Sequence, residues 1–251
     1  MEEEKKIKDD SEQKEMSFFD HLDELRKRII WSLLAVVLCC VVAGFSVDFI
    51  IEDILLRYAK LAGYDEIINR LPFGQPFLYF KVVLIAGIII ASPFILFQLW
   101  KFIQPGLYPK ERKWVRIVTF FTSICFFAGV AFSYWIMLPS MLSFGASFGT
   151  KQIKNFLDVN DFFGFIVTII LVSGLVFELP MVSFVLAKIG ILTSNFMRKY
   201  RRHSIIVILI LAAVLTPTPD PISQLIFAAP LFVLYEISIW ITKLAEQKHK
   251  I

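Results

Sequence analysis

Residues that usually build catalytic or metal sites are scarce in this sequence, which has three cysteines and three histidines in 251 residues. Cys39, Cys40 and Cys125 all fall inside long apolar runs. Small hydrophobic side chains in a helix interface are the expected role there, rather than a disulfide or a metal site. No HExxH pattern, paired metal ligands or phosphate-binding glycine loop is present. We therefore expect no metal and no cofactor.

Charge is also scarce, because only 19% of the residues are charged whereas 57% are hydrophobic. Soluble domains are usually about 45–50% apolar. The excess lies in long runs that are continuously apolar and do not alternate with polar residues. Backbone polar groups in lipid must be satisfied internally, so such runs indicate membrane-spanning helices rather than barrel strands. The sequence predicts an all-α integral membrane protein.

Six apolar segments predict six transmembrane helices, of which the fifth and sixth are short. They cover approximately residues 29–47, 77–99, 115–138, 162–187, 203–217 and 222–241. The fifth would be only about 22 Å long, against a hydrocarbon core of about 30 Å. We expect the bilayer to thin around it, the alternative being a re-entrant hairpin with the sixth segment.

The distribution of basic residues orients these helices. Of 26 lysines and arginines, 20 fall in the termini and loops on one side and 5 in the loops on the other. Basic residues concentrate on the cytoplasmic side, so both termini are expected in the cytoplasm. The net charge of +4 is explained by these cytoplasmic basic residues. The expected partner is therefore a lipid bilayer rather than nucleic acid. We expect a disordered charged tail at 1–16, a membrane domain at 17–244 and a cytoplasmic tail at 245–251.

One stretch, GASFG at residues 145–149, formally matches the nucleophile elbow G-x-S-x-G. That motif requires a strand-turn-helix setting and a histidine base. Ser147 is instead expected in a loop between membrane helices, with every histidine on the opposite side. The sequence therefore predicts a protein that is not an enzyme.

The most informative single residue is Glu178, which is expected in the middle of the fourth segment, two residues before Pro180. An ionisable group at mid-bilayer costs at least ~2.5 kcal/mol on insertion scales, so it should face protein or water. A hydrogen bond to a neighbouring helix is one explanation. The functional alternatives are a docking point for another membrane helix and a proton-responsive site.

Two further carboxylates, Glu24 and Glu111, are expected at the cytoplasmic interface on different elements. Alone, Glu24 is explained by an i, i+4 ion pair with Arg28. Glu111 is explained by the dipole of a helix that starts near Pro109. Together they would offer a cationic peptide two carboxylates where the loops are otherwise basic.

Several long stretches resemble the TatC family, the polytopic core of the twin-arginine protein translocase. They are HLDELRKRII, ASPFILFQLWKFIQPGLYPKERK, GLVFELP, LTPTPDPISQ and PLFVLYEISI. The resemblance implies recognition of paired arginines in the signal peptides of already folded proteins. It also implies assembly with small single-span partners of the TatA and TatB type and with other copies of the chain. Transport would be driven by the proton-motive force. The absence of a recognisable transit peptide favours a bacterial inner membrane over a thylakoid.

The resemblance also implies two groups of site residues, carried over by motif position. The signal-peptide surface would comprise Glu24, Arg26, Phe102, Leu107 and Glu111. Contacts with partner helices would involve Glu178, Thr216 and Gln224. Asp220 matches an acidic residue of the family's outer turn, and no role is assigned to it.

Two features depart from the family pattern. The first outer helix contains ILLRY and lacks the family's usual proline, so nothing is carried over to that loop. The turn TPTPDP is longer by one residue, so Thr216 and Asp220 need not keep the usual spacing. The alternative function is a proton-coupled small-molecule transporter with Glu178 as the relay. Such a transporter predicts more ionisable groups at the midplane and internal repeats, and the sequence shows neither.

Overall fold

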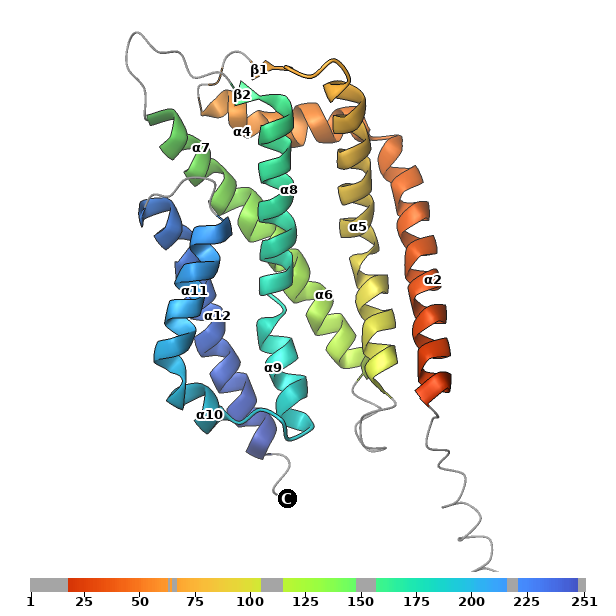
Figure 1. Cartoon of the computed structure of the whole chain (residues 1–251), viewed down its shortest axis with the longest axis vertical. Helices are drawn as coiled ribbons and strands as arrows, with labels where there is room; N and C mark the ends of the chain where they lie inside the picture. Colours follow the sequence, from red (N-terminus) through yellow and green to blue (C-terminus); the bar gives the residue numbers. More distant parts are fainter. Residues whose placement is uncertain are drawn as a thin grey trace, which may run out of the picture.

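The structure, a computed structural model, describes residues 18–62, 64, 67–104, 115–147, 157–215 and 221–247, which are mostly helical. Its long helices run roughly along one axis (Figure 1). Five of them are long and apolar enough to cross a membrane: Phe19–Gly44, Gly74–Ile103, Arg116–Ser147, Val159–Lys188 and Gln224–Glu246. The prediction of a helical membrane protein is confirmed at this level.

Helices α2 (Phe18–Gly44) and α5 (Gly74–Ile103) lie side by side at one edge of the molecule (Figure 1). The segment around Glu24 and the first span form one continuous helix. Few side chains of α2 are buried, because α5 is its main packing partner. A side chain at Gly87 would collide with Cys40, so this glycine permits the close approach of the two helices.

A helical segment runs across one end of the bundle (Figure 1) and includes the ILLRY stretch of the first outer helix. It consists of α3 (Val47–Phe49), the π-helical η1 (Ile50–Leu55) and α4 (Leu56–Leu61). Its amphipathic pattern buries Ile51, Leu55 and Ala59 at four-residue intervals. The Tyr134 hydroxyl donates to the carbonyl of Ile54 at 3.0 Å, which fastens this segment to the third span.

Two short parallel strands, β1 (Ile67–Ile68) and β2 (Leu157–Asp158), join the loops at the same end. Asp158 is the N-cap of α8, and its carboxylate accepts hydrogen bonds from the backbone N–H groups of Asn160 and Asp161. Desolvation alone would raise the pKa of Asp158, but hydrogen bonds from backbone N–H groups, including that of Arg70, lower it overall. A carboxylate at this position satisfies donors that a helix start leaves open.

The third span is longer than predicted. It comprises α6 (Val115–Phe132), the π-helical η4 (Ser133–Met137) and α7 (Leu138–Ser147), whereas the sequence predicted an end at 138. Pro139 lies in the first turn of α7, directly after the π-helical turn. Proline therefore continues the helical path after the π turn instead of ending it. Ser147, which was expected in a loop, is instead the last residue of this helix, and its hydroxyl donates to the carbonyl of Phe144.

The fourth span, predicted as one helix over 162–187, is divided into α8 (Val159–Val176) and α9 (Leu179–Lys188). Pro180 lies in the first turn of α9. It has no N–H to donate to the carbonyl of Val176, so the helical hydrogen bonding is interrupted there. Glu178 occupies the N-cap position of α9.

The last part of the chain forms α10 (Ser194–Lys199), α11 (Arg201–Leu215) and α12 (Pro221–Gln247). Helix α11 has 15 residues, which correspond to about 22 Å. Helix α12 has 27 residues, so the prediction that the sixth helix is short is wrong. The helix continues past residue 244 because its last turns pack against α10. Both carboxylate oxygens of Glu246 accept hydrogen bonds from Ser194, one from its N–H and one from its hydroxyl, each at 2.7 Å.

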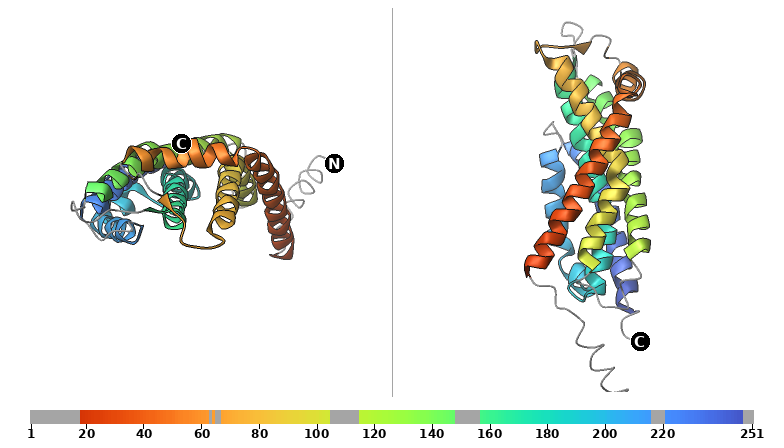
Figure 2. Two further views of the ribbon diagram at one scale, coloured as in Figure 1. Left: turned by 90° about the horizontal axis from the view of Figure 1, so that it is seen from above. Right: turned by 90° about the vertical axis from the view of Figure 1, so that its right-hand side faces the viewer.

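Seen along their length, the helices follow an arc rather than a closed ring in the part of the chain that is described (Figure 2). The end of the bundle where α2 begins and α5 finishes is called the Glu24 end below. Helix α12 also finishes at this end, which lies at the bottom of Figure 1.

Candidate functional site

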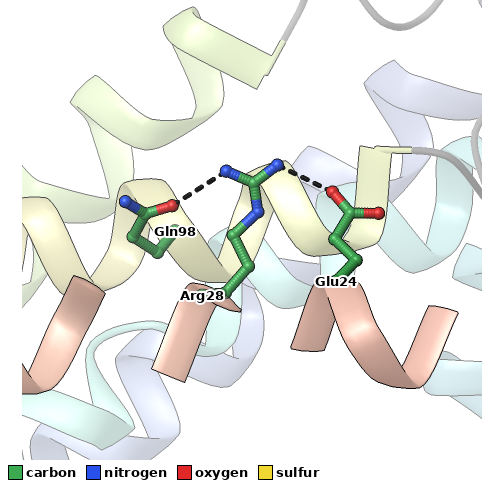
Figure 3. Close-up of polar contacts among 3 residues, drawn as sticks. All are labelled: Glu24, Arg28 and Gln98. Carbon is green, nitrogen blue, oxygen red and sulfur yellow. Dashed lines mark hydrogen bonds and ion pairs between the residues drawn. The ribbon is translucent and has the colours of Figure 1, made fainter. Parts of the chain in front are cut away.

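The side chain of Glu24 belongs to a polar bridge between α2 and α5 at the Glu24 end (Figure 3). Nη2 of Arg28 donates to Oε1 of Glu24 at 2.7 Å, and Nη1 of Arg28 donates to Oε1 of Gln98 at 3.0 Å. The side chains of Glu24 and Arg28 are only 17% and 20% exposed. The predicted i, i+4 ion pair is therefore present, but it is shielded from water and also connects two helices.

The ion pair between Glu24 and Arg28 is incomplete. Oε2 of Glu24 and Nε of Arg28 are buried and have no hydrogen-bond partner among the described residues. Oε2 points away from Arg28 in Figure 3. Buried polar atoms in folded proteins nearly always have a partner, so each unpaired atom requires an explanation.

An aromatic contact lies beside this bridge. Phe102, in the last turn of α5, stacks on His21 of α2 with ring centroids 4.3 Å apart and an interplanar angle of 16°. His21 precedes Glu24 by three residues, so the stack and the carboxylate lie close together along α2. The structure thus brings two of the predicted site residues, Glu24 and Phe102, to the same end of the same helix pair.

A groove of about 350 Å³ separates α2 and α5 next to the bridge. Its walls are mostly apolar, and Arg28, Gln98 and Phe102 are among the residues that line it. This end of the helix pair therefore combines an anionic acceptor with an apolar recess.

The structure says less about the remaining residues of the predicted signal-peptide surface. Arg26 lies on α2 with its side chain exposed. Leu107 and Glu111 lie outside the described residues, so their placement relative to Glu24 stays a prediction.

Gln98 and His21 also belong to this site, although neither was predicted from the sequence. Gln98 could have been recognised from the sequence, because it is an amide in the apolar run ASPFILFQLW. The structure shows it buried in a span. Polar groups at such positions need a partner within the protein. No local pattern pointed to Arg28 as that partner, since 70 positions separate the two residues.

Glu178 is buried at the junction of α8 and α9, with 7% of its surface exposed. Its backbone carbonyl accepts hydrogen bonds from the N–H groups of Met181 and Val182, which start α9. Its side chain does not cap that helix, and Oε1 has no hydrogen-bond partner among the described residues. The predicted hydrogen bond to a neighbouring helix is therefore not made by this oxygen.

Gln224 forms a contact within the chain, because its Nε2 donates to the carbonyl of Leu209 at 2.9 Å and links α12 to α11. Thr216 and Asp220 lie outside the described residues. In the described part of the chain, no group of three or more His, Cys, Asp or Glu side chains could hold a metal ion.

Comparison with known proteins gives a consistent result. Residues 20–230 match the model of the family described as Sec-independent protein translocase protein (TatC). The chain is 39% identical over 237 residues to the Sec-independent protein translocase protein TatC of Carboxydothermus hydrogenoformans, covering 94% of this chain and 97% of that one. It is 34% identical over 234 residues to the chloroplastic homologue TATC of Arabidopsis thaliana, covering 92% of this chain and 67% of that one.

The fold is similar to that of a solved structure as well. A crystal structure of the twin arginine translocase receptor TatC superposes with a TM-score of 0.78 at 33% identity. The match covers 90% of this chain and 99% of that one.

Proposed function

Because the chain belongs to the TatC family of Sec-independent protein translocase proteins, we propose that it binds the paired-arginine signal peptides of folded proteins at the Glu24 end. Its role in the twin-arginine translocase is that of a receptor. The observation that carries the proposal is a buried carboxylate oxygen, Oε2 of Glu24, that has no partner among the described residues. A guanidinium group of the ligand would supply the missing donor.

The chemistry of the site suits arginine. Charge-assisted hydrogen bonds between a guanidinium group and a carboxylate are short and strong, and a second carboxylate would accommodate the second arginine. We assign Glu111 to that role, with Arg26, Phe102 and Leu107 completing the surface. Phe102 supports this assignment because it stands beside Glu24 through its stack on His21.

We further propose that the chain spans the membrane six times, with α11 as the additional span and both termini in the cytoplasm. Basic side chains at or near the Glu24 end support this orientation. Among the described residues they are Arg26, Lys27, Arg28, Lys101, Arg116, Lys188, Arg198, Lys199, Arg201, Arg202 and Lys243. The short α11 would require local thinning of the bilayer. Residues 1–16 and 245–251 would be cytoplasmic tails of the membrane domain.

These helices indicate a multi-pass membrane protein. We assign it to the inner membrane of a bacterium, and a thylakoid membrane is the alternative. Its partners would be single-span proteins of the TatA and TatB type and further copies of the chain, in a complex driven by the proton-motive force. Contacts with partner helices would use Glu178, Thr216 and Gln224. The unpaired Oε1 of Glu178 supports this assignment.

Photocross-linking tests the signal-peptide site directly. A photoreactive residue at position 102, which keeps both Glu24 and Glu111, is expected to capture an Arg-Arg signal peptide about tenfold better than its Lys-Lys counterpart, because a guanidinium group forms the stronger carboxylate contact. The same residue at position 31, where Trp31 is 58% exposed on α2, provides the control. Equal capture of the two peptides at 102 would contradict the proposal.

The substitution Glu178→Leu tests the partner contact. A hydrogen bond between membrane helices is worth about 0.6–2 kcal/mol, so recovery of the small single-span partners should fall roughly threefold to thirtyfold in co-purification. Glu236→Gln is the matched control, because Glu236 forms an exposed ion pair with Arg201 on another part of the chain. Unchanged recovery with Glu178→Leu would show that Glu178 serves only the fold.

A further inference from the structure

The ion pair of Glu24 and Arg28 has an unusual form for a buried guanidinium and carboxylate. Such pairs frequently make two parallel hydrogen bonds, but here only Nη2 and Oε1 are joined. The two atoms left without partners, Nε of Arg28 and Oε2 of Glu24, are those that a second parallel bond would join. Both are buried, so water does not compensate for the missing bond.

Gln98 restrains the guanidinium group of Arg28 from its other side. Its Oε1 accepts a hydrogen bond from Nη1 of Arg28 at 3.0 Å, on the side of the guanidinium group opposite Glu24 (Figure 3). A planar guanidinium group held at Nη1 by one helix cannot turn freely to present a second donor to a carboxylate. Gln98 is itself fixed, because it is buried in α5.

We propose that Gln98 is a positioning residue, which holds Arg28 so that Arg28 occupies only one oxygen of Glu24 and leaves the buried Oε2 unpaired, for the guanidinium group of a ligand that displaces the side chains covering it. The inference rests on the proposed function of Glu24, and it adds two residues to the site. Arg28 orients the carboxylate through Oε1. Gln98 prevents Arg28 from forming hydrogen bonds with both carboxylate oxygens of Glu24, which would leave no acceptor for a ligand.

The proposal predicts a specific effect of Gln98→Leu. Without its amide, Arg28 is free to form two hydrogen bonds with Glu24, so a ligand has to break one of them before it binds. Hydrogen bonds between charged groups are worth about 1.5–3 kcal/mol, which corresponds to at least a tenfold weaker affinity. The variant Gln98→Glu keeps an acceptor for Nη1 and adds a negative charge, so it should bind the Arg-Arg peptide at least as tightly as the native chain.

The experiment measures the dissociation constants of labelled synthetic Arg-Arg and Lys-Lys signal peptides for the full-length chain with its partners in lipid nanodiscs. Gln98→Leu is tested alone and together with Arg28→Gln. In the Arg28→Gln background, Gln98→Leu should have no further effect, because Gln98 acts through Arg28. Gln98→Leu on its own should weaken binding of the Arg-Arg peptide at least tenfold.

Each other outcome counts against the proposal in a distinguishable way. An equal loss from Gln98→Leu in both backgrounds would assign Gln98 to packing, and an unchanged affinity would remove it from the site. Either result would leave the receptor function intact as long as the native chain prefers the Arg-Arg peptide. A native chain without that preference would overturn both the proposed function and the inference.

Discussion

Glu24→Gln is expected to weaken binding of an Arg-Arg signal peptide about 100-fold. The substitution removes the anionic acceptor and leaves the shielded guanidinium group of Arg28 without its counter-charge. The site would then repel a cation instead of attracting it. Removing one member of a buried charge pair typically costs 2–5 kcal/mol, and about 2.7 kcal/mol corresponds to 100-fold. The measurement is the dissociation constant of the labelled peptide in nanodiscs.

Asp23→Asn provides the matched control for this prediction. Asp23 is the preceding residue of α2, its side chain is exposed, and the substitution changes the net charge by the same amount. Its effect should stay within about twofold, since exposed charges are screened by salt. If the two variants weakened binding equally, Glu24 would contribute only to the general electrostatic field of the chain.

Gly129→Ala is expected to destabilise the whole fold. A Cβ atom at Gly129 of α6 would lie 2.5 Å from the carbonyl oxygen of Ser173 and 2.9 Å from Cα of Gly174. Both are backbone atoms of α8, so relief requires the two spans to move apart rather than a side chain to rotate. Overpacking of this kind costs about 1–3 kcal/mol. The apparent Tm in detergent should fall by roughly 5 °C.

The control for Gly129→Ala is Gly164→Ala, also in a membrane-spanning helix. A Cβ atom at Gly164 has no neighbour within 4 Å, and alanine favours the helix more than glycine does. The Tm of this variant should be equal to or slightly above that of the native chain. A Gly129→Ala variant as stable as the native chain would show that α6 and α8 can separate at little cost.

The long helices could be predicted because lipid imposes a simple rule on the sequence: each span needs a long apolar run. The positions at which a helix breaks inside a span are harder to predict from the sequence. Pro180 indicated an irregularity, but only the structure shows α8 and α9 as separate helices on either side of it. The proline at 139 had the opposite consequence, since it lies in the first turn of a helix that continues to Ser147.

The candidate site was predictable only in part, for a related reason. Glu24 and Phe102 could be named from the motifs that carry the family resemblance. The role of Gln98 depends on the packing of α5 against α2, which brings together residues 70 positions apart. A single sequence contains no local pattern for such a contact. The sequence alone shows that the carboxylate of Glu24 is present. Only the tertiary structure shows the orientation in which it is held.

The arc formed by the helices limits what one copy of the chain can enclose. In the described part of the chain, the spans stand in a curved row that is open on one side (Figure 2). One copy therefore contributes a wall, and lipids or other subunits must provide the remaining boundary of any passage for a folded domain.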